Sequence, residues 1–458
     1  FLFNFLKFNR ALPSAVSTFE RRAIEFDASV EKAVVLQHHQ DNFHAFIEIR
    51  MHSWYHASLA DFFAMSFHGF LGKFAVQYYG EGGIGIQNQL IQAIPHLISS
   101  EPVIAMHSII VKVRGDRALL EKLRGEEPMV FWDLIQKEKK WEEVFQMITQ
   151  YLKNWGYRCS GELMLTHDNY IENPSALIAL IKQMEGIADF DPAQKMKEKY
   201  TEAQSVKAAF RKKIMRQFWY RPDRIVVHLF LLHYLVKQSC NGISSRERVR
   251  LKQAQLYFGF KKTLHAIGEN WVRQGFIDER DDILFFTYSE IAEHLESSSL
   301  LSQDIQGEIK NRKERWKEKS NESYPDDFYT YFGRYYQSHE VASKNHDKSA
   351  KGDLTGLCAC GGRVEGTVRV LDSVLEADKL NPGDILVTRQ TDPGWITVFP
   401  LISGLIVERG GMLSHGAIVS REFGIPAIVG VHEATRKLKD GDRITLNASQ
   451  GIIALHDE

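Results

Sequence analysis

Apolar and aromatic side chains recur every three to four residues along roughly residues 15–300, with polar and charged positions between them. This spacing matches the turn of an α-helix, so it predicts a series of helices that each bury one face. One stretch shows it most clearly, through Phe62, Met65, Phe67, Phe70, Leu71, Phe74 and Tyr78. Residues 206–236 repeat the pattern, with Arg and Lys on the opposite side. We therefore expect a mainly helical N-terminal and middle domain.

The aromatic stripe at residues 62–78 has two interpretations. Side chains at this spacing usually form the core between packed helices. They also suit a deep apolar pocket, because ligand sites combine such side chains with a few polar groups. The glycine-rich residues 80–85 lack a preceding strand and a following Lys-Ser/Thr pair. We expect a flexible connection between helices there rather than a nucleotide-binding loop.

The pattern of the chain changes before residue 354. Residues 303–353 are polar and weakly patterned, which predicts an exposed helix followed by a flexible linker at residues 338–353. From Leu354 onward, short β-rich runs alternate with Asn-Pro-Gly and Asp-Pro-Gly turns. The sequence thus predicts a multidomain fold, with a mainly α-helical domain at residues 1–337, the linker, and a small α/β domain at residues 354–458.

The most informative segment of the chain is residues 402–431, ISGLIVERGGMLSHGAIVSREFGIPAIVGV. It predicts an apolar strand, a turn at residues 408–411, a helix from Ser414 to Gly424, and a second apolar strand after Pro426. This arrangement points His415 toward solvent from the first turn of the helix.

An imidazole at that position suits a phosphate bonded to it. The unpaired backbone N–H groups and the positive end of the helix dipole stabilise a phosphoryl group, and they keep His415 neutral and nucleophilic near pH 7. The phosphate-stabilising residues predicted around it are Gly410, Gly411, Ser414 and Gly416. The two glycines of the turn allow close backbone approach, and the serine can cap the helix. The alternative is that His415 only caps a helix of an unrelated α/β domain.

The sequence GGMLSHGAIVSREFGIPAIVGV, with TDPGW at residues 391–395 before it, resembles the phosphohistidine swivelling domain of phosphoenolpyruvate-utilising enzymes. That family includes pyruvate phosphate dikinases, phosphoenolpyruvate synthases and rifampicin phosphotransferases. The resemblance implies that His415 is the phosphate carrier. Leu413 stands where the dikinases have a regulatory threonine, so we do not expect that control here.

Three stretches of the middle region resemble the central helical domain of rifampicin-phosphotransferase-like proteins. They are residues 155–163 with 172–174, residues 246–257, and residues 268–290. The order of a helical domain before a C-terminal histidine domain also resembles these proteins. Only a short stretch follows the histidine motif, whereas a phosphoenolpyruvate-binding β/α barrel needs about 200 residues or more. We therefore expect no such barrel.

The resemblance implies a phosphotransferase that carries a phosphoryl group from ATP, through His415, to a hydroxyl acceptor. The expected acceptor is rifamycin-like or another bulky hydrophobic alcohol. ATP and Mg²⁺ are expected through an ATP-grasp domain or subunit, because no ATP-binding pattern appears in this sequence. The alternatives are a pyruvate, water dikinase or phenylphosphate-synthase-like subunit, and a non-catalytic phosphocarrier or binding module.

Two smaller groups of residues are candidates for the acceptor site. His52 and His56 lie four residues apart on a predicted helix, and one of them could deprotonate the acceptor hydroxyl. No carboxylate accompanies them as in an HExxH pattern, so we predict no metal site. Arg158 and Glu162, also four apart, could bracket the acceptor or form a plain intrahelical ion pair.

Charge, hydropathy and cysteine content exclude several classes of protein. The formal net charge is −1 and no long basic stretch occurs, so we expect no nucleic-acid partner. The longest uncharged apolar stretch, residues 225–236, is too short to span a membrane. The four cysteines are too sparse for a disulfide framework, which indicates reduced thiols in a cytoplasmic protein.

One prediction follows from the missing nucleotide pattern. Because no phosphate-cradling loop with a basic partner is visible, this chain alone should neither bind ATP tightly nor hydrolyse it. Isothermal titration with Mg-ATP should show no heat above that of dilution. A micromolar dissociation constant would mean that the chain contains a nucleotide site of another kind.

Overall fold

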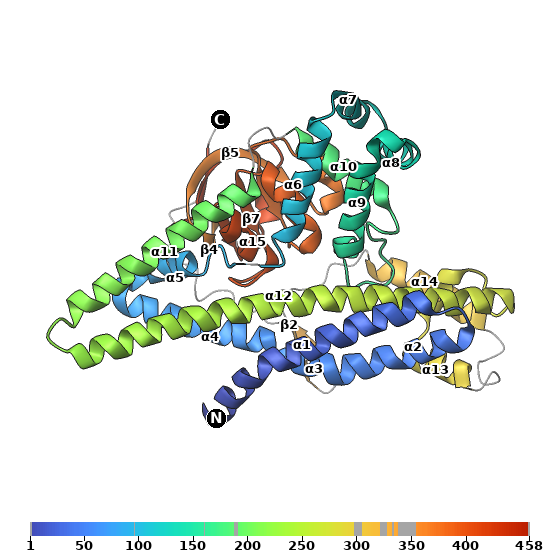
Figure 1. Ribbon diagram of the computed structural model, residues 1–458, viewed down its shortest axis with the longest axis horizontal. Helices are drawn as coiled ribbons and strands as arrows, with labels where there is room; N and C mark the ends of the chain where they lie inside the picture. The colour runs from blue at the N-terminus through green and yellow to red at the C-terminus, as the bar shows by residue number, and fades with distance from the viewer. Residues whose placement is uncertain are drawn as a thin grey trace.

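A computed structural model gives the arrangement of the chain (Figure 1). The residues that it describes are 2–95, 97–159, 161–186, 191–296, 305–320, 328–331, 334–337 and 354–456. The linker predicted at residues 338–353 lies outside the described residues. No helix among those described is both long and apolar enough to cross a membrane.

The part before residue 321 is helical, as predicted. Its first helices are α1 (Leu2–Lys32), α2 (Leu36–Glu48), α3 (Trp54–Ala57), α4 (Leu59–Tyr79), α5 (Gly83–Leu90), α6 (Glu101–Arg114) and α7 (Arg117–Gly125). The next are α8 (Pro128–Lys137), α9 (Glu142–Trp155), α10 (Pro174–Glu185), α11 (Pro192–Gln217), α12 (Pro222–Arg273), α13 (Tyr288–Glu296) and α14 (Ile305–Ser320). A two-stranded hairpin of β1 (Phe328–Tyr331) and β2 (Arg334–Gln337) follows.

The 52-residue helix α12 runs along the helical part and packs against α1, α2 and α4 (Figure 1). Helix α4 lies so close to it that a Cβ added at Gly242 would meet the Cα atom of Ala64 at 2.8 Å. The aromatic stripe of α4 was predicted to form either the helix core or an apolar pocket, and its residues divide between core and surface. Phe67 and Leu71 are buried in the core, whereas Met65 is 67% exposed.

Residues 206–236 are largely helical, as their spacing predicts, but they belong to two helices, because the chain turns between α11 and α12 and Pro222 begins the second helix. Proline suits the first turn of a helix, where its missing N–H has no partner to lose. Residues 80–82 connect two helices, as predicted, and form a short 3₁₀ turn (Gly80–Gly82), whereas residues 83–85 already belong to α5.

The C-terminal part is a small α/β domain, as predicted. Its eight strands are β3 (Leu354–Thr355), β4 (Leu357–Cys360), β5 (Arg363–Val370), β6 (Ile385–Thr388), β7 (Gly404–Val407), β8 (Ala427–Val429), β9 (Arg443–Asn447) and β10 (Ile452–Leu455). The strand order is β3-β10-β9-β5-β6-β7-β8-β4, with parallel pairs from β5 to β8. Strands β3 and β4 lie at opposite ends of this order, yet only Gly356 separates them in the chain. The sheet therefore curls back on itself like a barrel.

The α/β domain packs directly on the helical part. Its helix α15 (His415–Phe423) contacts α11, and its strand β4 contacts α5. Ile418 of α15 shares an apolar cluster with Leu90 and Ile94 of the helical part. Figure 1 shows the α/β domain resting above α12, between the α5–α11 side and the group of helices α6, α9 and α10. The two parts share a buried interface, and α15 lies in it.

The close packing of α12 on α4 predicts the effect of a small substitution. Gly242→Ala should lower the free energy of unfolding by about 1–3 kcal/mol, because the added methyl group meets backbone that cannot move aside. Gly69→Ala on α4 is the matched control, since a Cβ there meets nothing within 4 Å. Alanine also favours helix, so Gly69→Ala should be neutral or slightly stabilising. Equal urea midpoints for the two variants would contradict this account.

Candidate active site

Helix α15 holds the candidate histidine at its first residue. The side chain of Ser414 caps the helix by accepting a hydrogen bond from the Ala417 N–H at 3.4 Å. Gly424 ends the helix in the left-handed conformation, at φ 70°. The N–H of Gly416 donates to Thr391 Oγ1 at 3.0 Å. The helix thus begins and ends where the sequence predicts.

The surroundings of His415 differ from the prediction. We expected this side chain to point toward solvent, and that expectation is wrong for the docked arrangement, in which it is only 5% exposed. The helical part covers it with side chains from the segment before α6 and from α12. Burial lowers the pKa of His415, against the opposing effect of the nearby Glu247 carboxylate. The imidazole is therefore neutral at pH 7.

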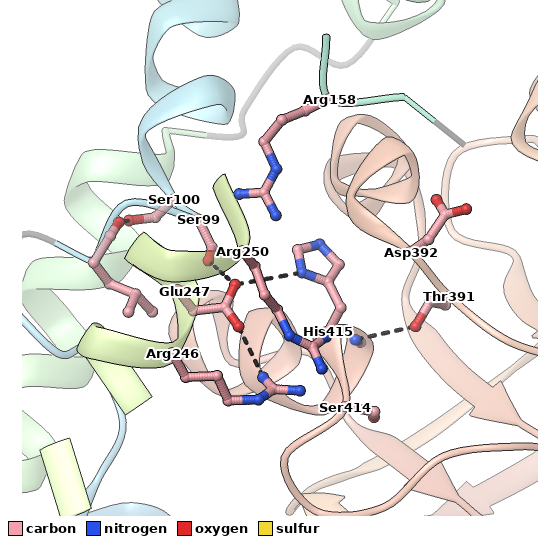
Figure 2. Close-up of polar contacts among 12 residues, drawn as sticks. Ser99, Ser100, Arg158, Arg246, Glu247, Arg250, Thr391, Asp392, Ser414 and His415 are labelled. Carbon is pink, nitrogen blue, oxygen red and sulfur yellow. Dashed lines mark hydrogen bonds and ion pairs between the residues drawn. The ribbon is translucent and has the colours of Figure 1, made fainter. Parts of the chain in front are cut away.

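The partner of His415 is the buried carboxylate of Glu247 on α12. Its Oε2 lies 3.9 Å from His415 Nδ1 (Figure 2). Arg246 Nη1 donates to Glu247 Oε1 at 2.8 Å, and Ser99 Oγ donates to Oε2. Burial alone would raise the pKa of Glu247, but the contacts with His415 and Arg246 outweigh it and hold that pKa well below its usual range. Glu247 is therefore ionised.

An ionised carboxylate facing Nδ1 fixes the tautomer of the imidazole. It favours the form with hydrogen on Nδ1, which leaves a lone pair on Nε2. Nε2 is buried and has no hydrogen-bond partner among the described residues. Buried polar atoms are rarely left in this state without a functional reason. His415 Nε2 is therefore the ring nitrogen whose lone pair is available.

A cleft of about 890 Å³ opens beside His415, between the two parts of the chain. Its apolar lining consists of Met65, Leu163, Met164, Met412 and Leu413. Its charged lining includes Arg246 and Arg250 from successive turns of α12. Arg246 Nε donates to Asp61 Oδ1 at 2.6 Å, and Arg250 lies 3.7 Å from the same oxygen. Arg246 therefore pairs with two carboxylates, Asp61 and Glu247, whereas Arg250 makes only the longer contact with Asp61 and is the less neutralised of the two guanidinium groups on the cleft.

Three of the four predicted phosphate-stabilising residues line this cleft, and Gly416 does not. Gly410, Gly411 and Ser414 line it directly, together with His415. The φ of Gly410 is 141°, a conformation that a side chain would disfavour. Gly416 contributes its backbone N–H to Thr391, as described above.

Arg158 and Glu162 form an ion pair at the site, with Nε and Oε2 3.3 Å apart. The pair is not intrahelical, because it lies in the loop after α9. Arg158 lines a small cavity together with His415, and its Nη2 is buried without a hydrogen-bond partner (Figure 2). Glu162 lines the cleft, and its burial, partly offset by Arg158, raises its pKa to about 7.

The structure does not bring His52 and His56 to His415. Both are exposed, His52 in the π-helical segment Ile49–Ser53 and His56 in α3, and neither lines the cleft. Their helical spacing shows only that they share a face. His68 of α4 lies on the cleft instead, and burial together with Arg421 lowers its pKa to about 4.

The sequence analysis missed the residues that approach the histidine from the helical part. They are Asp61, Ser99, Arg246, Glu247 and Arg250. One signal could have found three of them. Residues 246, 247 and 250 place charges on neighbouring turns of a long helix that is otherwise partly buried.

Comparison with known proteins gives two matches to protein families. Residues 380–451 match the mobile domain of PEP-utilising enzymes. Residues 57–247 match the fourth domain of rifampicin phosphotransferases. The first range includes His415, and the second ends at Glu247, so the contact between these residues joins the two domains.

Curated relatives show the same combination. A rifampicin phosphotransferase of Bacillus cereus is 30% identical over 80% of this chain and 40% of its own length. Another from Bacillus subtilis is 28% identical over 80% of this chain and 41% of its own. A phosphoenolpyruvate synthase of Aeropyrum pernix is 45% identical, but over only 22% of this chain and 12% of its own. The chain thus spans about two fifths of the rifampicin phosphotransferases that it matches. By these two matches the chain combines the mobile domain of PEP-utilising enzymes with the fourth domain of rifampicin phosphotransferases, and rifampicin phosphotransferases are its homologues.

Proposed function

We propose that this chain is the carrier and acceptor part of a phosphotransferase. His415 Nε2 accepts a phosphoryl group that originates from ATP and passes it to a hydroxyl group bound in the cleft. One observation carries this proposal: a neutral, buried imidazole with an unpartnered Nε2 lies on a cleft that also presents Arg246 and Arg250. Positive groups held beside a transferring phosphoryl group stabilise its transition state.

Phosphorylation of the histidine is the first half of the proposed reaction. The Nε2 lone pair attacks phosphorus, an N–P bond forms, and a P–O bond of the nucleotide breaks. By analogy with the family the β-phosphate moves: AMP leaves when the P–O bond between the α- and β-phosphates breaks, and water cleaves the bond between the β- and γ-phosphates and releases phosphate, so one phosphoryl group stays on the histidine. An ATP-grasp domain or subunit supplies the nucleotide and Mg²⁺. In the docked arrangement His415 is buried under the helical part, so the α/β domain must leave this position to reach a nucleotide site.

Transfer to the acceptor is the second half. The acceptor oxygen attacks phosphorus, the N–P bond breaks, and its electron pair returns to Nε2. The hydroxyl proton passes to a carboxylate of the cleft, where the described candidates are Asp61, Glu162 and Asp392. Asp61 binds Arg246, and Asp392 accepts backbone hydrogen bonds from Gly161 and Gly394. We assign the base to Glu162, because a pKa of about 7 suits proton transfer near neutral pH.

The proposed acceptor is a bulky, largely apolar alcohol of the rifamycin type. The cleft volume of about 890 Å³ and its methionine and leucine lining support an acceptor of this size and polarity. The test presents the phosphorylated chain with rifampicin and, separately, with pyruvate. Phosphate transfer to rifampicin supports the assignment. Transfer to pyruvate alone would instead favour a dikinase-like reaction.

The carrier role of His415 predicts the behaviour of two variants. His415→Ala should abolish incorporation of acid-labile phosphate when a cognate ATP-grasp partner and radiolabelled ATP are supplied. The control is His432→Ala in the same domain, whose imidazole is 67% exposed and pairs with Glu433. It should keep full labelling. Retained acid-labile label in His415→Ala would contradict the assignment of His415 as the phosphate carrier.

The assignment of Glu162 predicts a pH dependence. The base must be deprotonated, so the single-turnover rate of transfer from the phosphorylated chain should rise with pH through about 7 and then level off. Glu162→Gln should lower this rate by about 10²–10⁴-fold and remove the rise. Glu198→Gln, at an exposed ion pair of α11, should change neither. An unchanged pH profile in Glu162→Gln would show that another group accepts the proton.

A further inference from the structure

A second cavity, of about 400 Å³, lies in the interface near the other end of α15. We call it the seam cavity. The helical part contributes Asn88, Gln92 and Lys199, and the α/β domain contributes Cys358, Arg421 and Ser449. None of these residues lines the cleft beside His415, although Arg421 donates to the backbone of Met412, which does. The phosphoryl transfer proposed above makes no use of the seam cavity.

Asn88 of α5 points to a missing hydrogen-bond donor in the seam cavity. The side chain is only 3% exposed. Its Nδ2 donates to the carbonyl oxygen of Cys358 at 3.0 Å, which fixes the orientation of the amide. Its Oδ1 is buried and has no hydrogen-bond partner among the described residues. An acceptor left in this state costs about 1–3 kcal/mol, and a ligand hydroxyl group would remove that cost.

Arg421 points to a missing anion. The guanidinium is 2% exposed and donates only to backbone carbonyls, from Nη2 to Met412 at 2.7 Å and from Nη1 to Ala359 at 3.4 Å. No carboxylate among the described residues lies within 4 Å of it. The adjacent Glu422 does not neutralise it, because burial raises the pKa of that carboxyl to about 8. A buried cation without a counter-ion is unfavourable.

The remaining charges of the seam cavity do not cancel that of Arg421. Lys199 and Glu202 pair with each other, with Nζ and Oε2 2.8 Å apart, so together they contribute no net charge. The lining therefore keeps one net positive charge. Ser449 also lines the cavity, and its Oγ accepts a hydrogen bond from the Gly362 N–H at 2.9 Å, so its own hydroxyl hydrogen can be donated to an oxyanion.

We propose that the seam cavity binds a small oxyanion that carries a hydroxyl hydrogen, of the class of hydrogen phosphate and of phosphate monoesters whose organic part has an alcohol group. Its negative oxygens face Arg421 and Lys199, and its hydroxyl group donates to Asn88 Oδ1. Because both parts of the chain line the cavity, the bound anion stabilises the docked arrangement of the α/β domain. This consequence rests on the proposed movement of that domain, whereas the binding itself does not.

Cys358 provides a reporter inside the cavity. Its thiol is free and partly buried, and it lines the cavity. The experiment measures the rate of its alkylation by iodoacetamide, read by mass spectrometry of the peptide, in inorganic phosphate, sulfate or chloride at equal ionic strength and pH 7.5. Phosphate should slow alkylation several-fold. Sulfate should protect less, because it has no hydroxyl hydrogen to donate to Asn88.

Two variants test the residues of the site. Asn88→Asp keeps the shape of the side chain but adds a negative charge, and Lys199→Gln removes a positive one. Each should lose the protection by phosphate. Lys197→Gln, on the exposed side of α11, is the matched control and should keep it. If Asn88→Asp does not fold, Lys199→Gln still tests the proposal, because its side chain lies at the partly exposed rim.

Further comparisons distinguish the possible explanations for protection of Cys358. His415→Ala should keep the protection, which distinguishes this cavity from the carrier site. Glycerol 3-phosphate compared with inorganic phosphate distinguishes a monoester ligand from free phosphate, and protection by either one supports the proposal. Equal protection by sulfate, retained protection in Asn88→Asp, or no protection by either phosphate compound would overturn it. None of these results would alter the labelling test of His415.

Discussion

The contact between the Glu247 carboxylate and the His415 imidazole is the interaction on which the rest of the site depends. It joins the helical part to the α/β domain through two buried side chains, at a position where an isolated charge would be very unfavourable. The helical part already supplies two partners to that carboxylate, Arg246 and Ser99. When the imidazole departs, Glu247 still keeps both. His415 can therefore leave Glu247 and return without leaving an unpaired buried charge behind. This property suits the movement proposed for the α/β domain.

The rest of the interface also combines contributions that favour docking of the α/β domain with contributions that oppose it. Apolar burial around Ile418 favours docking, as expected for side chains removed from water. Polar groups in the same interface oppose it. Glu422 accepts a hydrogen bond from the Ile94 N–H, but its Oε2 has no partner among the described residues, and burial keeps the carboxyl largely protonated. Undocking would hydrate and ionise it. An interface that combines apolar gain with incompletely satisfied polar groups favours reversible docking over permanent assembly.

Local residue chemistry explains which parts of this molecule the sequence could predict. Ser414 and Gly424 mark the two ends of α15 because capping depends on neighbouring backbone groups alone. The burial of His415 could not be predicted in this way, since the group that covers it, Glu247, lies far away in the chain. For His52 and His56, the spacing in the sequence suggested a site that the structure does not form. Helical spacing places two side chains on one face, but only tertiary packing decides whether that face meets the cleft or solvent.

The two ring nitrogen atoms of His415 have different electrostatic surroundings. A phosphoryl group on Nε2 carries negative charge, which Glu247 would repel if it were placed beside that atom. Instead the carboxylate faces Nδ1, where it fixes the tautomer from across the ring. Arg158, with its unpartnered Nη2, shares a small cavity with the same histidine and supplies positive charge there. The carboxylate thus orients the ring from the Nδ1 side and leaves Nε2 without a negative neighbour, an arrangement that suits the phosphoryl transfer proposed for this histidine.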